Sequence, residues 1–202
     1  MYPLFETLSI DNGHIRNVEW HCRRFETSYS SLYRHCPTYS LFDNIHIPSE
    51  YCTGIFRLRI SYNESSTKTE IEPYITKDIT RLKVWAVASS FDYSLKYTDR
   101  SVINNLFSHR GCCDDVLIIK DGMVTDTSVC NIVFFDGQKW ITPSTPLLCG
   151  TARARLLTDG TIEERPIAES DIHKFEAFRL INALRQFDTV ATTTTDNIIG
   201  FL

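Results

Sequence analysis

The sequence predicts an α+β protein with two domains, and three observations along its 202 residues lead to that prediction. Residues 1–74 combine strand-like alternation of apolar and polar residues with one long stretch of helical periodicity. Residues 82–202 are dominated by short apolar runs separated by turn signals, as expected of mostly antiparallel strands. The run between them, residues 75–81, is polar and predicts a linker.

The N-terminal domain begins with a predicted hairpin over residues 4–15. Its apolar and polar residues alternate, and the DNG sequence at residues 11–13 is a strong turn signal. From Val18 onward apolar residues recur at helical spacing, which predicts a helix that ends near Cys36.

Residues 54–62, with the sequence GIFRLRISY, alternate again and predict a strand. Arg57 and Arg59 share one face of this strand, which is a solvated face unless it borders a cleft. The polar segment that follows, with Pro73, carries no predicted element.

The C-terminal domain contains a series of shorter elements. In order, the patterns predict a strand at 82–90, a helix at 100–111, strand pairs around Asp121-Gly122 and Asp136-Gly137, a helix at 150–160 with Gly160 at its C-cap, a strand running into a turn at 175–187, and a β-favouring run at 192–195.

Composition narrows the class of function. The formal net charge is −4 and basic residues are not clustered, so no nucleic-acid partner is expected. The N-terminus lacks the pattern of a secretion signal, and no apolar window is long enough for a membrane helix. Seven cysteines without a C-x-x-C pair favour reduced thiols in the cytoplasm, and the histidines show no metal-ligand spacing.

Four fragments then occur in a meaningful order along the chain. They are HCRR at 21–24, LKYTDR at 95–100, GMVTDTSVCNIVF at 122–134 and WITPSTPLLCGTARARLL at 140–157. In this order and spacing they resemble the class IV aminotransferase family, the fold-type IV pyridoxal 5'-phosphate (PLP) enzymes.

The resemblance implies a fold, a cofactor and an assembly. The expected fold has a small N-terminal α/β domain and a larger C-terminal domain with a mostly antiparallel, barrel-like sheet. The expected cofactor is PLP, and the expected assembly is a homodimer with a small-molecule amino substrate.

Within this resemblance, Lys96 is the Schiff-base lysine and the general base that moves the substrate's α-proton. Taken alone, it would be an ordinary solvated loop lysine. Asp126 is matched to the carboxylate beside the pyridine nitrogen, where the family has Glu, and Asn131 follows five residues later as in the family. Aspartate keeps the carboxylate but is one methylene shorter than glutamate. Without the resemblance, Asp126 would be interpreted as a turn residue.

The phosphate of PLP needs hydrogen-bond donors, and the resemblance supplies candidates. Arg24 matches the family's H-x-x-R arginine, with Arg23 as a rival on the same helix. The other candidates are the start of the helix at 150–160, where backbone N–H groups are available, and a second loop in LINALR. These candidates are Gly150, Thr151, Ala152, Asn182 and Ala183.

The sequence indicates the reaction less specifically than it indicates the cofactor. Lys96 is followed four residues later by Arg100, a spacing that resembles the 4-amino-4-deoxychorismate lyases, which release pyruvate and leave p-aminobenzoate for folate biosynthesis. Arg57, Arg59 and Arg100 are the candidate substrate residues. Three alternatives stay open: an aminotransferase of the branched-chain or D-amino acid type, a non-catalytic PLP-binding member, and an unrelated α+β binding module.

Overall fold

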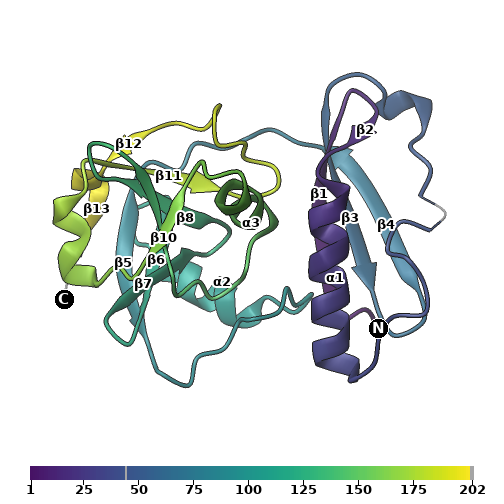
Figure 1. Cartoon of the computed structure of the whole chain (residues 1–202), viewed down its shortest axis with the longest axis horizontal. Coiled ribbons are helices and arrows are strands. Elements are labelled where there is room, and N and C mark those ends of the chain that lie inside the picture. The colour runs from purple at the N-terminus through teal and green to yellow at the C-terminus, as the bar shows by residue number, and fades with distance from the viewer. Residues whose placement is uncertain (44, 201–202) are drawn as a thin grey trace. The chain divides into compact units, whose positions relative to one another are not determined.

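The computed structural model describes residues 1–43 and 45–200, so the last two positions of the predicted C-terminal domain lie outside the described part. The chain forms two compact units (Figure 1). Unit 1 contains Met1–Thr76 together with Leu95–Asp99, and unit 2 contains Lys77–Ser94 together with Arg100–Leu202.

Unit 1 is a four-stranded antiparallel sheet with one long helix packed against it. The strand order is β2-β1-β3-β4, and the apolar residues of β1 and β3 meet those of α1 in one core. The elements are β1 (Leu4–Asp11), β2 (His14–Ile15), α1 (Val18–Tyr33), the 3-10 turn η1 (Ser49–Tyr51), β3 (Ile55–Tyr62) and β4 (Thr67–Pro73).

The predicted hairpin and helix of unit 1 are confirmed. Asn12 and Gly13 form the hairpin turn with positive φ angles of 49° and 80°, a conformation that these residue types adopt readily. Helix α1 stops at Tyr33, a little earlier than predicted. Arg34 enters the left-handed conformation and its N–H closes the helix on the carbonyl of Ser30.

Strand β4 was missed by the sequence reasoning. Its residues are mostly exposed, so no buried face gives it an apolar period. The strand exists because it pairs with β3 from Phe56↔Pro73 to Tyr62↔Thr67, and Pro73 lies at its end, where a missing N–H costs least.

The segment around Lys96 belongs to unit 1, although the predicted C-terminal domain of residues 82–202 includes it. It runs beside the start of β1: the N–H of Phe5 donates to the carbonyl of Lys96 at 3.1 Å, and the N–H of Thr98 donates to Pro3 at 2.8 Å. This backbone pairing explains why the Lys96 segment belongs to unit 1, and no sequence pattern predicts it. The domain limits themselves stay a prediction.

Unit 2 is built on one extended sheet with the path β10-β9-β8-β7-β6-β5-β13, to which β11 and β12 are added beside β8. The pairs β5–β6, β9–β10 and β5–β13 are parallel and the others antiparallel. Its elements are β5 (Leu82–Val87), α2 (Ser101–Ser108), β6 (Asp115–Lys120), β7 (Met123–Thr127), β8 (Asn131–Phe135), β9 (Trp140–Pro143), α3 (Thr151–Thr158), β10 (Glu163–Arg165), η2 (Glu169–Lys174), β11 (Ala177–Ile181), β12 (Thr193–Thr194), η3 (Thr195–Asn197) and β13 (Ile198–Ile199).

The predicted turns of unit 2 are confirmed, and so is the α+β class. Asp121 and Gly122 take positive φ angles between β6 and β7, and Gly137 does so between β8 and β9. Gly160, with φ of 68°, follows the end of α3, whose C-cap is Asp159. Among the described residues the sheet path ends at β10 and β13, so the predicted barrel-like sheet is open.

No helix among the described residues is both long and apolar enough to cross a membrane.

Candidate active site

In unit 1 the side chain of Lys96 lies against the ring of Phe5. Its Nζ is 4.9 Å from the ring centroid, and the guanidinium carbon of Arg59 is 3.9 Å from the same centroid. Phe5 is buried, and both cations are half-buried. An aromatic face attracts cations, so Phe5 gathers two positive side chains in one place. Such a place suits an anionic ligand.

Next to Phe5 on β1, Glu6 points into the core of unit 1, between the inward positions of Leu4 and Leu8. Its carboxylate accepts a hydrogen bond from Nε of Arg24 at 2.8 Å and a second one from Nη2 of the same guanidinium. Nδ1 of His21 lies 2.6 Å from the carboxylate and must donate, because an ionised carboxylate only accepts.

The environment fixes the charge of this cluster. Burial alone would raise the pKa of Glu6, but the positive charge of Arg24 and the hydrogen bond from His21 outweigh it and lower the pKa to about 2. Burial lowers the pKa of His21, so the imidazole is neutral with its proton on Nδ1. Glu6 and Arg24 therefore form a buried ion pair that orients the arginine.

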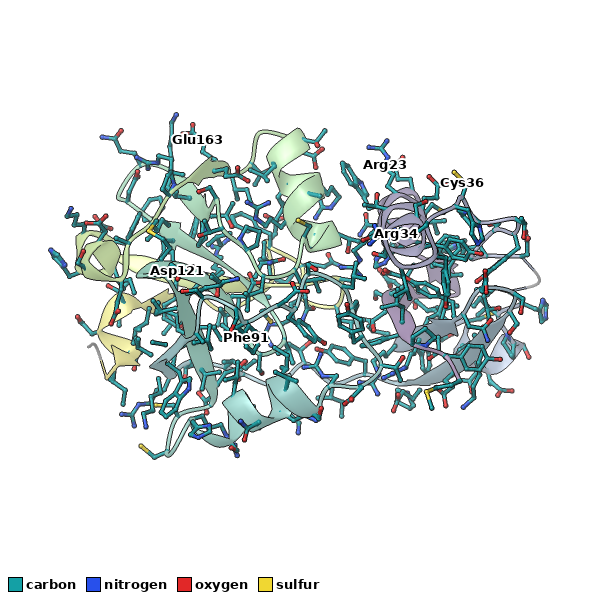
Figure 2. The ribbon with its side chains drawn as sticks, turned by 90° about the horizontal axis from the view of Figure 1, so that it is seen from below. Arg23, Arg34, Cys36, Phe91, Asp121 and Glu163 are labelled. Carbon is teal, nitrogen blue, oxygen red and sulfur yellow. The ribbon has the colours of Figure 1, made fainter. Side chains whose placement is uncertain are left out.

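This pairing bears on the arginine predicted to hold the phosphate. Arg24 keeps a side-chain exposure of 12%, and one edge of its planar guanidinium is fixed by Glu6. Its rival Arg23 is exposed and points away from α1 (Figure 2), with its guanidinium 4.8 Å from the ring of Trp20. Of the two, Arg24 is the one held in a defined position; its role toward phosphate stays a prediction.

In unit 2, Asp126 and Asn131 face each other across β7 and β8. Nδ2 of Asn131 donates to Oδ1 of Asp126 at 2.7 Å, and the N–H of Leu148 donates to Oδ2 at 2.9 Å. Burial raises the pKa of Asp126 to about 6, although these hydrogen bonds and the charge of Arg153 oppose the rise. A buried cation beside this carboxylate would keep it ionised.

Asn131 also joins Asp126 to the start of α3. The same Nδ2 donates to the carbonyl of Leu148 at 3.0 Å, and a Cβ at Gly150 would lie only 1.9 Å from Oδ1 of Asn131. Gly150 is the N-cap of α3 and provides no side-chain cap. The chain thus needs glycine here to bring the helix start close to Asn131.

Two further predicted residues of unit 2, Arg100 and Asn182, contact the turn between β7 and β8. Nη2 of Arg100 donates to the carbonyl of Ser128 at 2.8 Å, and Nδ2 of Asn182 donates to that of Val129 at 3.2 Å. Thr151 is buried, and Ala152 and Ala183 are half-buried.

The three predicted substrate arginines differ in their surroundings. Arg57 forms an exposed ion pair with Glu72, and Arg59 stacks on Phe5. Arg100 donates a hydrogen bond to the backbone of the β7–β8 turn. Their role toward a substrate stays a prediction, and Arg59 is the one placed beside Lys96 in unit 1.

Two residues of the site were missed by sequence reasoning. Glu6 carried a usable signal, because an acidic residue occupies an inward position of an alternating strand. Arg153 carried another: it is a cation in the first turn of a helix, where the dipole disfavours positive charge. It is buried, donates to the carbonyl of Pro143 at 2.9 Å and pairs with Glu164.

The residues present fit PLP. Asp126 is a buried carboxylate suited to a pyridinium, the uncapped start of α3 lies beside it through Asn131, and a lysine and an oriented arginine lie in unit 1. Across the described positions no group of His, Cys, Asp and Glu side chains is arranged to bind a metal.

Comparison with known proteins agrees with this chemistry. The profile of the family described as amino-transferase class IV matches residues 3–191. An uncharacterised protein of Haemophilus influenzae is 45% identical over 186 residues, covering 91% of this chain and 98% of its own length.

Two solved structures illustrate the relationship. A proposed 4-amino-4-deoxychorismate lyase from Haemophilus somnus has a TM-score of 0.87 and 36% identity, covering 93% of this chain and 98% of its own. A hypothetical aminotransferase from Mycobacterium tuberculosis, in its PLP-bound form, has a TM-score of 0.70 and 17% identity, covering 98% and 82%, which shows a common fold. The cofactor implied by the sequence motifs agrees with these matches.

Proposed function

This chain belongs to the class IV aminotransferase family, and from that premise we propose that it is a PLP-dependent lyase acting on 4-amino-4-deoxychorismate or a close analogue. The reaction releases pyruvate and leaves p-aminobenzoate. The observation that carries the cofactor assignment is the buried Asp126, held by Asn131 and the N–H of Leu148 next to Gly150.

Lys96 would have two roles in this proposal. Its ε-amino group would hold PLP through the aldehyde, and the same amino group would accept the proton from the substrate carbon that bears the amino group. When bound, PLP supplies the electron sink for that step. Nζ of Lys96 lies 4.9 Å from the centroid of the Phe5 ring, a contact that favours this direction of the lysine side chain.

The remaining residues bind and orient. Asp126 holds the pyridine nitrogen protonated, while Arg24, Asn182-Ala183 and the start of α3 at Gly150-Thr151-Ala152 bind the phosphate. Arg59 receives a substrate carboxylate, because its guanidinium lies on the same ring as Lys96.

The lyase assignment, rather than aminotransfer, rests on two supports. Arg100 follows Lys96 four residues later, a spacing that resembles the lyases, and the Haemophilus somnus relative at 36% identity is a proposed lyase. An aminotransferase remains the alternative, since the family contains both.

The cofactor assignment is tested by chemical labelling. After incubation with PLP, borohydride reduction and peptide mapping should place the pyridoxyl group on Lys96, one of seven lysines. Lys96→Ala should lose the label, whereas Lys83→Ala, which removes a lysine stacked on Trp85 in unit 2, should keep it. A label on another lysine in the wild-type protein would overturn the assignment.

The reaction is tested with a substrate panel. Incubation with 4-amino-4-deoxychorismate should yield pyruvate and p-aminobenzoate in equal amounts. Branched-chain and D-amino acids with a keto-acid acceptor should show much slower amino transfer. The opposite order of rates would favour the aminotransferase.

We also propose that the chain acts as a homodimer, which the resemblance to the family implied. Light scattering should give twice the mass of 23.3 kDa at micromolar concentration. A fully active monomer would contradict this proposal.

A further inference from the structure

The turn between β7 and β8 connects the two residues that form the Asp126–Asn131 pair. It is closed by the N–H of Thr127, which donates to the carbonyl of Cys130 at 2.9 Å, and by the N–H of Cys130, which donates to the hydroxyl of Thr127 at 3.1 Å. Any shift of this turn therefore moves Asp126 relative to Asn131.

Side chains from three other segments hold this turn. Oδ1 of Asp115, at the start of β6, faces the N–H of Ser128 at 3.4 Å. Arg100 donates to the carbonyl of Ser128 at 2.8 Å, and Asn182 donates to the carbonyl of Val129 at 3.2 Å. Ser128 is thus contacted on both its N–H and its carbonyl.

Asp115 is the unexpected member of this set. It is only 1% exposed; its Oδ1 also accepts the N–H of Val116 at 2.8 Å, and its Oδ2 has no hydrogen-bond partner. Burial raises its pKa, and the nearby Ser128 side chain is foremost among the groups that oppose this rise. A buried carboxyl with one unpartnered oxygen lowers stability compared with an apolar residue of similar size. Its presence therefore calls for a role other than packing.

We propose that Asp115 is a positioning residue that sets the β7–β8 turn and, through it, the carboxylate of Asp126. The role in cofactor binding rests on the proposed function, while the effect on the turn does not. Arg100 and Asn182 hold the carbonyl side of the turn, and Asp115 is the side chain that holds its N–H side.

The test compares three variants. Asp115→Ala removes the contact, and Asp115→Asn keeps an oxygen that accepts the N–H groups of Val116 and Ser128. The control, Asp114→Asn, removes the same charge one residue earlier, where the carboxylate is exposed and binds the N–H groups of Thr80 and Arg81. Thermal unfolding verifies that each variant is folded.

The first measurement is hydrogen exchange in the cofactor-free protein, on a peptide that covers residues 127–131. Asp115→Ala should speed exchange there about tenfold, on the order of one lost hydrogen bond to a charged group. Asp115→Asn should stay within about twofold of wild type, and Asp114→Asn should leave this peptide unchanged.

The second measurement is PLP affinity by absorbance titration. Asp115→Ala should weaken binding roughly five- to tenfold with labelling still on Lys96, and Asp115→Asn should restore most of the affinity. Unchanged exchange in Asp115→Ala, or an equal effect of Asp114→Asn, would overturn the proposal. A wild-type chain that binds no PLP would refute the proposed function, while the exchange measurement still decides whether Asp115 holds the turn.

If Asp115→Ala does not fold, Arg100→Gln provides the parallel test from the other side of Ser128. It should speed exchange in the same peptide, because it removes the hydrogen bond to the carbonyl of Ser128. Unchanged exchange in Arg100→Gln would count against the proposal that side-chain contacts to Ser128 hold this turn.

Discussion

At the scale of single residues, the Glu6–Arg24 pair decides how the N-terminal half of the site is held. The carboxylate is 1% exposed and the guanidinium 12% exposed, so neither charge is well solvated. In such a pair the attraction offsets the cost of burial only while both partners are present.

Arg24→Ala should therefore destabilise unit 1 strongly. It leaves the Glu6 carboxylate buried without its ion pair, although the hydrogen bond from Nδ1 of His21 remains. We expect a loss of about 3–5 kcal/mol in the free energy of unfolding, measured with urea on the cofactor-free protein.

The double variant Glu6→Gln, Arg24→Ala separates this effect from phosphate binding. It should regain part of the stability, because no buried charge remains, but its PLP affinity should stay low. Recovery of both properties together would mean that Arg24 acts only on the fold.

A second prediction at this scale concerns the contribution of Asp126 to stability at different pH values. Its folded-state pKa of about 6 lies above the ordinary aspartate value of 3.8, so the folded protein binds the proton more tightly than the unfolded chain. Asp126 therefore adds stability as the pH falls through 6 and removes it as the pH rises. The upper limit of this contribution is about 3 kcal/mol, because the folded-state pKa exceeds the ordinary value by roughly two.

The measurement must separate the effect of Asp126 from that of other groups that titrate in the same pH range. The neutral His21 has a lowered pKa and works in the opposite sense, since its protonation in acid destabilises the fold. Urea unfolding of cofactor-free wild type and Asp126→Asn between pH 5 and 8 gives the difference. Wild type should gain stability over the variant toward pH 5; parallel pH profiles would show that Asp126 is ionised throughout.

At the scale of elements, the contact between β8 and α3 depends on a glycine. Gly150 has φ of −70°, which any residue can adopt, so the need for glycine is purely one of space. An alanine Cβ would lie 1.9 Å from Oδ1 of Asn131. The side chain of Asn131 would have to leave Asp126, or the helix start would have to move.

Gly150→Ala should weaken PLP binding at least about tenfold, close to 1.4 kcal/mol, because it disturbs both the carboxylate and the phosphate side of the site. Titration of PLP absorbance measures this. In an Asn131→Ala background the same change should cost little, because the clashing atom is gone. Equal losses in both backgrounds would place the effect in the helix itself.

At the scale of elements, some parts of the fold could be predicted from the sequence and others could not. Hairpin turns, α1 and the strands with a buried face were predictable, because period and turn chemistry are local properties. Strand β4 was not, since its exposed residues gain their structure only from pairing with β3.

The candidate site residues could be named from the sequence, but the contacts that support them could not. Lys96, Asp126 and Gly150 were named through the resemblance, which preserves motif spacing, and their roles stay a prediction. The ion pair of Glu6 and the turn contact of Asp115 depend on side chains that meet only after folding. Their one local signal is an acidic residue at an inward strand position, which is ambiguous without the partner.

At the scale of the whole molecule, the chain alternates between its two units. It leaves unit 1 after Thr76, returns for Leu95–Asp99 and then completes unit 2. The candidate residues are divided in the same way: Lys96 and Arg24 belong to unit 1, and Asp126 and Gly150 belong to unit 2. The proposed function assigns both sets to a single PLP.

This division predicts that PLP links the unfolding of the two units. Trp20 lies in unit 1, and the only other tryptophans, Trp85 and Trp140, lie in unit 2. A Trp85→Phe, Trp140→Phe variant therefore reports on unit 1, and a Trp20→Phe variant reports on unit 2. Without PLP, the two fluorescence midpoints in urea should be free to differ.

With PLP at 100 times its Kd, both midpoints should rise, since a ligand that binds only the folded state stabilises by RT ln(1 + [L]/Kd), about 2.7 kcal/mol. They should also converge, because unfolding of either unit removes groups that hold the cofactor. Lys96→Ala should reduce both shifts together, whereas Lys83→Ala should leave them unchanged. A rise confined to the unit 2 probe would mean that Asp126 and the start of α3 bind PLP without the lysine, and the role of Lys96 would have to be assigned to another residue.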